Sequence, residues 1–479
     1  MELNLIVHQN KQGIIGINGQ LLCSIKEDLQ WFRRITSSSS KNVIIMGYNT
    51  WESLPMKPLP GRINIVISNN HYEEIKECHE FKEKGCHIFP SLEESFNYLQ
   101  SIDNGKVCNI GKVFIIGGGQ LYSHVVMNHR DKITRIYKTE SNILYNPQEG
   151  DNIVYFNCPE LPYKISFSKQ CQGKIYNSLE MSTIPCEFTI YQNHINENEN
   201  QYLDLLRKVR DRGDIKQTRN SKVYSLFGEK MVFDLRKGFP LLTSKKMGWK
   251  TILRELLWFI SGSTDNRDLN EKKVHIWNKN AEEYHSRSDL EEGDLGPVYG
   301  FQWRHFGADY VSCETDYTGK GVDQIKQIIE QIQENPTSRR LIFSAWNPVD
   351  IPHMALPPCH VMTQFNIDVE GGWIDAQLYQ RSGDMFLGIP FNIASYSFLL
   401  HIIGNITGYK PRYLHHVIGD AHIYECHLSA IDKQLCRGTY PSPQLTLINP
   451  IQDIDTIVEE NITIHNYKCD ERIVAEMIA

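Results

Sequence analysis

The sequence predicts two domains, an α/β domain with a mostly parallel central sheet followed by a domain built around buried helices. Three observations support this prediction. At 479 residues the chain exceeds the length that one hydrophobic core usually supports. Short apolar runs alternate with helical patterns in the first part, which is typical of a parallel sheet with crossover helices. In the second part, Ile252–Ile260 and Phe391–Ile406 are apolar on nearly every face, as expected of helices buried all round.

The strands expected in the first domain are short apolar runs: Leu3–Val7, Asn42–Met46, Ile63–Ser68 and Val113–Ile116. A helix is predicted over Asp28–Ile35, because Leu29, Phe32 and Ile35 recur at helical spacing. Residues 165–190 are more irregular, with one strand-like run at 188–191. The polar run 194–201 lacks apolar periodicity and is predicted to be a short linker between domains 1–193 and 202–479. A helix over Tyr202–Val209 opens the second domain.

Composition restricts the function classes. Hydrophobic residues make up 41% and charged residues 22%, which excludes a disordered or collagen-like chain. The net charge of −7 disfavours binding to nucleic acid. No basic N-terminal region and no apolar stretch of about 20 residues is seen, so we expect neither secretion nor membrane insertion. Twelve cysteines include no CxxC pair, so we expect no metal site and a reducing, cytoplasmic location.

Cys359 is the candidate nucleophile of the second domain. It follows two prolines and precedes His360, and arginines lie nearby in sequence at Ser338-Arg339-Arg340 and Gln380-Arg381-Ser382. Arginine is rarely buried without an anion, so these positions favour a phosphate or carboxylate ligand. Guanidinium groups near the thiol would also favour its ionisation. The alternative is an inert, buried cysteine.

Glu255 is the candidate buried acid of the second domain. It lies in Leu253-Arg254-Glu255-Leu256-Leu257, a helical segment with little polar surface. An unpaired carboxylate there would be costly, which indicates a functional role. The alternative is a structural pair between Glu255 and Arg254 or another cation.

Two features of the first domain are candidate functional sites. A strand at 113–116 runs into Gly117-Gly118-Gly119 and a predicted helix, so bare backbone and helix N–H groups could approach a pyrophosphate. This run matches neither a Walker loop nor the dinucleotide fingerprint, and a structural turn is an equal alternative. Asp28 begins an amphipathic helix, where it is either a site carboxylate or part of a solvated face.

Seven spaced blocks between about residues 200 and 479 resemble the thymidylate synthase family. The blocks are Gly238-Phe239-Pro240-Leu241-Leu242-Thr243, Glu255-Leu256-Leu257-Trp258-Phe259, Gly296-Pro297-Val298-Tyr299-Gly300, Pro358-Cys359-His360, Gln380-Arg381-Ser382-Gly383-Asp384, Phe391-Asn392-Ile393-Ala394-Ser395-Tyr396 and Gly419-Asp420-Ala421-His422-Ile423-Tyr424. The resemblance implies an α+β fold and methylation of dUMP to dTMP by 5,10-methylenetetrahydrofolate. It also implies a homodimer through this domain, in which Arg339 and Arg340 reach the partner's site.

The same resemblance implies roles for individual residues. Cys359 would be the nucleophile, Glu255 would order proton transfer, and Tyr299 and His360 would support it. Trp277 and Asp384 would contact the folate. The dUMP-binding residues would be Arg219, Arg339, Arg340, Arg381, Ser382, Asp384, Asn392, His422 and Tyr424. The loop after Arg219 and the tail 467–474 depart from the family's pattern.

Residues 1 to about 193 resemble the dihydrofolate reductase family. The matching blocks are Ile15-Gly16-Ile17-Asn18-Gly19, Asp28-Leu29-Gln30-Trp31-Phe32, Ile45-Met46-Gly47, Thr50-Trp51-Glu52-Ser53, Pro58-Leu59-Pro60-Gly61-Arg62 and Ile116-Gly117-Gly118-Gly119. The resemblance implies reduction of dihydrofolate with NADPH, with Asp28 promoting protonation of the pterin. Phe32, Arg62, Thr139 and Ile116 would complete the folate site. The cofactor site would comprise Gly16, Gly47, Thr50, Ser68, Gly117, Gly118, Gly119, Gln120, Leu121 and Tyr122.

The first domain departs from its family at His8, Leu22-Cys23, Tyr48 and Asn69. His8 replaces a small residue, Leu22-Cys23 replaces Pro-Trp, and the last two replace cations expected near the 2′-phosphate of NADPH. The main hypothesis is an enzyme with both activities. A second hypothesis is an active synthase whose reductase-like domain only binds or scaffolds, and a third is a non-enzymatic folate or nucleotide sensor.

Overall fold

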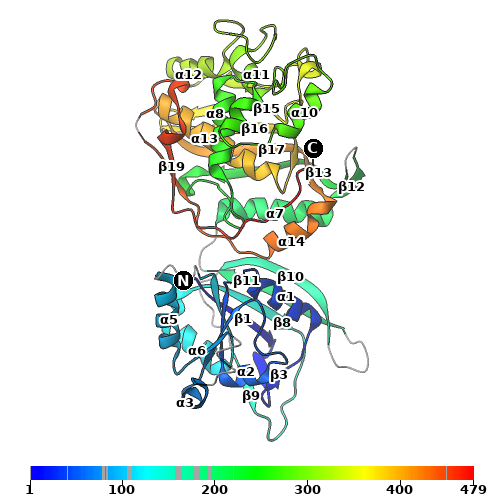
Figure 1. Cartoon of the computed structure of the whole chain (residues 1–479), viewed down its shortest axis with the longest axis vertical. Coiled ribbons are helices and arrows are strands. Elements are labelled where there is room, and N and C mark those ends of the chain that lie inside the picture. The colour runs from blue at the N-terminus through cyan, green and yellow to red at the C-terminus, as the bar shows by residue number, and fades with distance from the viewer. Residues whose placement is uncertain are drawn as a thin grey trace. The chain divides into compact units, whose positions relative to one another are not determined.

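The computed structural model describes residues 2–39, 41–77, 81, 85–104, 110–156, 164–175, 183–192, 196–218, 221–448 and 450–478. The chain forms two compact units, Met1–Ile195 and Asn196–Ala479. In Figure 1 the first unit is drawn in blue and cyan, and the second runs from green to red. Each unit has its own sheet and its own hydrophobic core.

The first unit is built on an eight-stranded sheet. In spatial order its strands are β10 (Lys164–Lys174), β11 (Thr183–Gln192), β8 (Ile133–Ser141), β1 (Glu2–Asn10), β7 (Lys112–Gly117), β4 (Val43–Gly47), β5 (Ile63–Ile67) and β6 (Cys86–Phe89). The six strands from β8 to β6 are parallel, and β10 and β11 add an antiparallel pair. Both faces of a parallel sheet are covered, which is why Val43 to Met46 are all fully buried. The predicted α/β class is confirmed.

Helices follow the parallel strands, as the alternation of patterns predicts. They are α1 (Lys26–Thr36), α2 (Tyr48–Ser53), α3 (Tyr72–Ile75), α5 (Leu92–Asn104) and α6 (Gly119–Asn128). β2 (Ile14–Ile17), β3 (Gln20–Leu21) and β9 (Ile153–Tyr155) form a separate small sheet with the spatial order β3-β2-β9. The expectation of irregular structure over 165–190 is wrong for the described residues, because β10 and β11 form a regular antiparallel pair. β10 is the edge strand of this sheet, a position where polar residues are common.

The second unit has a six-stranded sheet of opposite character. Its spatial order is β12 (Asp214–Gln217), β13 (Lys222–Asp234), β17 (Lys410–Tyr424), β16 (Trp373–Asp384), β15 (His360–Asp368) and β14 (Ile342–Ser344). Only β16 and β17 are parallel, and α13 (Gly388–Thr407) connects them. The other pairs are antiparallel, which confirms the α+β class.

The remaining elements of the second unit surround this sheet. They are α7 (Glu197–Arg212), α8 (Trp249–Ser261), α9 (Asn266–Glu271), α10 (Asn278–His285), α11 (Tyr299–His305), α12 (Gln324–Glu334), α14 (Leu428–Leu435), β18 (Gln444–Leu447) and β19 (Ile462–His465). By length and composition α13 is apolar enough to cross a membrane. Of its most apolar window, 72% is buried within the unit, so it is a core helix.

The linker prediction over 194–201 needs correction. Residues 194 and 195 lie outside the described residues, but α7 already begins at Glu197. Two polar side chains of this turn stabilise the start of the second unit. Asn196 caps α7 by accepting a hydrogen bond from the N–H of Glu199. The buried carboxylate of Glu199 accepts hydrogen bonds from the backbone N–H groups of Thr243 and Ser244. Polar composition here marks a helix start, and the second unit begins at Asn196.

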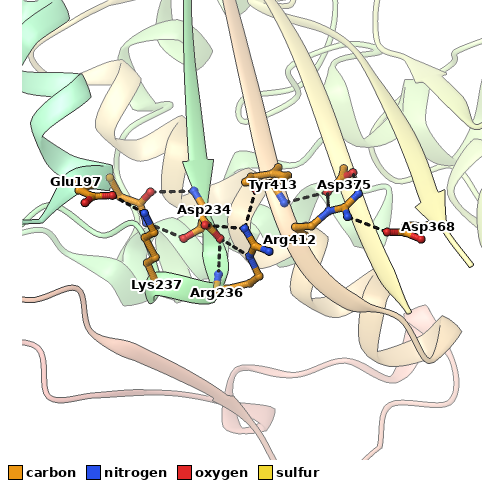
Figure 2. A network of polar contacts seen from close by, with 9 residues as sticks. Glu197, Asp234, Arg236, Lys237, Asp368, Asp375, Arg412 and Tyr413 are labelled. Carbon is orange, nitrogen blue, oxygen red and sulfur yellow. Dashed lines mark hydrogen bonds and ion pairs between the residues drawn. The ribbon is translucent and has the colours of Figure 1, made fainter. Parts of the chain in front are cut away.

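A charged network joins one end of the sheet of the second unit (Figure 2). Arg412, at the start of β17, donates to both oxygens of Asp375 on β16 at 3.0 and 2.8 Å, and to Asp368 on β15 at 2.8 Å. Arg236, just after β13, donates to Asp234 and to the hydroxyl of Tyr413. Charge-assisted bonds between neighbouring strands favour one strand register. The opposite end of the same strands carries the predicted synthase residues.

Candidate active sites

The predicted residues of the second unit gather where β15 begins and where β16 and β17 end. His360 pairs with Gln380, and Asp384 pairs with His422, so these positions share one edge of the sheet. Helix α13 starts four residues after Asp384 and brings Asn392 close to the same edge, where its side-chain oxygen accepts from Gln380. Strand register therefore brings together residues more than sixty positions apart in sequence.

Cys359 is partly buried at this edge. Its backbone N–H donates to the hydroxyl of Tyr299 at 2.6 Å, which joins α11 to the cysteine loop. The Arg381 guanidinium donates at 2.9 Å to the carbonyls of both Pro357 and Pro358. Burial raises the pKa of the Cys359 thiol, although the charge of Arg381 and a hydrogen bond with Tyr299 act in the other direction. The predicted effect of a nearby guanidinium has the expected sign for Arg381, but desolvation outweighs it, so the net pKa of the thiol is raised in the free protein.

A buried hydrogen-bonded chain fixes the amide of Asn392. Gln380 donates to the side-chain oxygen of Asn392 at 3.0 Å, and the imidazole of His416 lies 2.8 Å from the oxygen of Gln380. Burial lowers the pKa of His416 to about 3 and that of His360 to about 4, so both rings are neutral near pH 7. The sequence analysis assigned no role to Gln380 or His416. His416 carries no motif signal, since it lies in a run of ordinary strand composition.

Glu255 is buried on α8 and accepts a hydrogen bond from the indole N–H of Trp277 at 2.8 Å. Burial raises its pKa to about 7. The alternative pairing with Arg254 is wrong, because Arg254 points to Glu459 and bonds it. A carboxyl group with a pKa near neutrality can both give and take a proton at physiological pH.

Asp384, His422 and Tyr424 lie beyond the cysteine along the ends of β16 and β17. Asp384 accepts from the backbone N–H groups of Phe386 and Leu387 at 2.9 and 3.3 Å, which holds the turn into α13. His422 lies 3.4 Å from Asp420 and contacts the ring of Tyr424 edge-on. Ser382 pairs with Asp420 in the same register.

Lys245 is a buried cation that the sequence analysis did not single out. Its ammonium group donates to the carbonyl of Phe386, next to the turn that Asp384 holds. Burial lowers its pKa to about 7, against the opposing charges of Asp384 and Glu199. The available signal was a lysine three residues after the apolar run Phe239-Pro240-Leu241-Leu242, in a segment that is buried throughout and where a lysine is costly unless it has a partner.

The other predicted phosphate ligands are not brought to Cys359 within this chain. Arg339 and Arg340 are exposed and precede Ile342, which pairs with Gln364. Gln364 lies five residues along extended strand from Cys359, about 17 Å. Arg219 lies outside the described residues. Of the four predicted arginines, Arg381 is the one that the structure places beside the thiol.

The atypical C-terminal tail is anchored to the second unit. The Tyr467 hydroxyl donates to the carbonyl of Leu242 and accepts from the N–H of Met247. The N–H of Asp470 donates to the carbonyl of Thr243, and its carboxylate accepts from Tyr440. A tyrosine and an aspartate therefore hold the tail against residues 242–247.

In the first unit, Asp28 lies in the first turn of α1 with a side chain only 14% exposed. Its carboxylate is 3.7 Å from Nδ1 of His8, whose Nε2 lies 3.0 Å from the hydroxyl of Ser141. Thr139 is buried on β8 and pairs directly with His8 on β1. The solvated-face alternative for Asp28 is therefore wrong. His8, noted only as a departure, is the residue that faces the acid.

The three glycines form a close turn between β7 and α6. A Cβ on Gly117 would lie 3.0 Å from the hydroxyl of Thr50, and a Cβ on Gly119 would lie 2.6 Å from Val154. Gly47 and Gly118 also approach each other, since a Cβ on Gly47 would lie 3.7 Å from the nitrogen of Gly118. The bare backbone and the free N-terminus of α6 suit an anion such as a pyrophosphate.

The other predicted residues of the first unit occupy varied positions. Arg62 donates to Thr36 and lies over the ring of Phe32, 5.8 Å from its centre. Tyr122 is buried and donates to the carbonyl of Ile6. Ile116 and Leu121 are partly buried, Gln120 is exposed, and a Cβ on Gly16 would meet the carbonyl of Gln20.

His71 is a candidate cofactor residue that sequence reasoning missed. Its ring stacks on Tyr48 at 3.9 Å, and its Nδ1 lies 3.0 Å from the hydroxyl of Ser68. Ser68 follows β5 and Tyr48 follows β4, so the imidazole occupies the region where the sequence lacked cations. The sequence feature that could have indicated this role is the position of His71 three residues after Ser68, a predicted cofactor residue.

Comparison with known proteins assigns both units. The family model for dihydrofolate reductase matches residues 2–181, and that for thymidylate synthase matches residues 200–479. The fold and sites therefore define a chain with two enzyme domains, one of each class.

Relatives with both domains cover nearly the whole chain. A bifunctional dihydrofolate reductase-thymidylate synthase of Zea mays is 38% identical over 97% of this chain and 94% of its own length. One from Paramecium tetraurelia is 37% identical over 99% and 98%. A thymidylate synthase of Equine herpesvirus 2 is 48% identical over 58% of this chain and 98% of its own length. The chain belongs to the bifunctional dihydrofolate reductase-thymidylate synthase family.

The raised pKa of Glu255 predicts a pH-dependent stability. The folded protein holds this proton more tightly than the unfolded chain does, so the stabilisation is complete below the unfolded value of about 4.5 and is lost as pH rises through about 7. The Glu255→Gln variant carries an uncharged side chain at this position at every pH. Relative to wild type, it should gain about 3 kcal/mol between pH 5 and pH 8.

Urea unfolding followed by tryptophan fluorescence at the two pH values measures this difference. Glu460→Gln, which removes an exposed carboxylate, is the matched control and should show no such trend. Parallel pH profiles for Glu255→Gln and wild type would contradict the assigned burial effect.

Proposed function

We propose that the chain catalyses two linked reactions. The second unit methylates dUMP to dTMP with 5,10-methylenetetrahydrofolate, and the first unit reduces the resulting dihydrofolate with NADPH. The observation that carries the first half is the meeting of a thiol, a guanidinium and a fixed amide at one sheet edge. A near-neutral carboxyl group, that of Glu255, is linked to them through Trp277, whose ring contacts that of Tyr299. Buried polar groups are costly, and a catalytic role accounts for their concentration here.

Cys359 would act by covalent addition. Its sulfur forms a bond to C6 of the pyrimidine while the electrons of the C5–C6 double bond move toward C5 and the neighbouring carbonyl oxygen. The enolate then attacks the methylene carbon of the folate substrate as one carbon–nitrogen bond of that methylene breaks. Loss of the C5 proton releases the other folate nitrogen, and the folate delivers a hydride to the methylene carbon while the bond between Cys359 and C6 breaks, which leaves dTMP, dihydrofolate and the free cysteine. Arg381 and the Tyr299 hydroxyl are the two groups that favour the thiolate as it forms.

Neighbouring groups would position the pyrimidine and move protons. The amide of Asn392, held by Gln380, is fixed in the orientation needed to recognise one edge of the base. Glu255 would relay protons at neutral pH, and Trp277, bonded to it, would border the folate. Arg381 and Ser382 would meet the phosphate, and His422 with Tyr424 the sugar.

In the first unit the residues fit NADPH. The Gly117-Gly118-Gly119 turn and Thr50 would hold the pyrophosphate, and Ser68 with His71 would face the 2′-phosphate. When bound, NADPH supplies the hydride. Asp28, assisted by Thr139 and by His8, would hold the amidine edge of the pterin and promote its protonation. No observation favours a degenerate first unit.

A homodimer is proposed because Arg339 and Arg340 are exposed and remote from the thiol of their own chain. Isologous association would let each chain supply these guanidinium groups to its partner's site. A reducing location such as the cytoplasm is proposed because the twelve cysteines are scattered through the sequence without a CxxC pair.

Cys359→Ser should reduce dTMP formation by at least about 10³-fold, because a hydroxyl at this position lacks the nucleophilicity of a thiolate. Binding of dUMP should remain measurable by calorimetry. Cys426→Ser, at an exposed cysteine, is the control and should keep full activity. Normal turnover by Cys359→Ser would rule out this nucleophile.

Mixed dimers test the partner arginines. Subunits carrying Cys359→Ser and subunits carrying both Arg339→Ala and Arg340→Ala should each be inactive alone. After dissociation and remixing, one intact site forms per mixed dimer, so activity should return to about one quarter of wild type. As a control, Cys359→Ser mixed with Arg381→Ala should stay inactive, since both changes lie in a chain's own site. No recovery in the first mixture would exclude shared sites.

Asp28→Asn should cripple dihydrofolate reduction at neutral pH, because an amide cannot stabilise the protonated pterin. Loss of NADPH absorbance on adding dihydrofolate measures the rate. Glu27→Gln, in the same helical turn, is the control and should retain the rate. If the wild-type chain shows no NADPH oxidation while dTMP formation is intact, the reductase half of the proposal fails.

A further inference from the structure

A cluster of two histidines and a glutamate lies in the first unit, outside both proposed active sites. Glu93 is in the first turn of α5, His124 lies on α6, and His129 directly follows α6. Among the residues that the structure describes, these form one group of three whose possible ligand atoms all lie within 4.8 Å of one another. We propose that Glu93, His124 and His129 form a binding site for a divalent transition-metal ion of the zinc class.

The three ligand atoms converge on one point. Nε2 of His124 lies 3.0 Å and Nε2 of His129 lies 3.3 Å from the same oxygen, Oε1 of Glu93. In a tetrahedral site with bonds of about 2.0 Å, neighbouring ligand atoms lie about 3.3 Å apart. The two distances to Glu93 match this value, and the two Nε2 atoms lie within 4.8 Å of each other, close enough for both to reach one ion after small side-chain rotations. Two imidazoles and one carboxylate are also a donor set that suits zinc.

The surroundings support the two rings in these orientations. His129 is buried and contacts the ring of Phe96 edge-on. The side-chain amide of Asn128 lies 3.3 Å from Nδ1 of His124, the position where a metal-binding histidine usually has a second partner. On metal binding, the Nε2 atom of each ring would coordinate the ion and the ring proton would be carried on Nδ1. For His124, a flip of the Asn128 amide would place its side-chain oxygen where it can accept a hydrogen bond from that Nδ1–H.

A cavity of about 330 Å³ adjoins the cluster. Glu93 and His129 line it together with Asn97, Gln100 and Lys132. The cavity gives solvent access to the side of the ligands, so water can supply the fourth position of a tetrahedral ion. This access distinguishes the cluster from a closed hydrogen-bonded group.

The site is separate from the proposed cofactor turn. Gly119 and His129 are ten residues apart along α6 and its C-cap, which is about 15 Å. An ion here would join the first turn of α5 to the end of α6. It would therefore stabilise the first unit without touching the reacting groups, and this inference does not depend on the reductase activity.

Zn²⁺ titration of the full-length chain, freed of metal with a chelator, tests the proposal by calorimetry. Wild type should bind one Zn²⁺ at this site, and His124→Gln and Glu93→Gln should each weaken that binding by about tenfold or more. His465→Gln, which removes an exposed histidine elsewhere, should bind like wild type. Equal Zn²⁺ affinity and stoichiometry in wild type and His124→Gln would overturn the proposal.

Co²⁺ provides an independent readout of the ligands. Binding at this site should give visible absorption of tetrahedral cobalt with no thiolate charge-transfer band, because none of the three ligands is a cysteine. The visible bands should be absent in His124→Gln. Zn²⁺ should also raise the melting temperature of wild type but not that of His124→Gln. A cobalt spectrum dominated by thiolate bands, or unchanged by His124→Gln, would refute the site.

Discussion

The register of β15, β16 and β17 is the constraint on which the proposed synthase site depends. Asp375 and Asp384 lie on the same strand, one in the charged network of Figure 2 and the other at the site. A slip of one residue would turn Ser382 and Asp384 to the opposite face of the sheet and separate His360 from Gln380. The bidentate bond of Arg412 to Asp375 disfavours that slip. The ion pairs at one end of the sheet thus stabilise the strand register that aligns the proposed site residues at the other end.

Burial has three different chemical consequences at this site. It keeps the Cys359 thiol protonated in the free protein, it keeps His360 neutral, and it brings Glu255 to a pKa of about 7. All three follow from the cost of holding charge away from water. A site with so few charged side chains of its own suits a charged substrate such as a nucleotide phosphate. The single guanidinium beside the thiol does not offset desolvation alone, which explains why further cations from a partner chain would be useful.

Sequence patterns predicted what periodicity and motifs encode. The strands at 3–7, 42–46, 63–68 and 113–116 and the buried helices were predicted because apolar spacing determines them directly. The linker prediction failed because capping and backbone bonds at Asn196 and Glu199 use the same polar residues that loops use. The direction of the Cys359 shift, the place of His71 beside Tyr48, and the meeting of Glu93 with His124 depend on distances between separate elements. A single sequence carries no record of those distances.

The departures of the first unit from its family leave the environment of Asp28 chemically intact. Burial raises the pKa of Cys23 to about 12, so this thiol stays neutral near the carboxylate. It therefore introduces no competing charge where an indole is usual. His8 adds a ring nitrogen 3.7 Å from the acid, and Ser141 fixes that ring from its other side. The Asp28 carboxylate is thus largely buried, faces the His8 ring and has a neutral thiol nearby, so it can select a protonatable heterocycle. The two departures beside Asp28 are therefore compatible with the chemistry, because Cys23 stays neutral and His8 presents a ring nitrogen to the carboxylate.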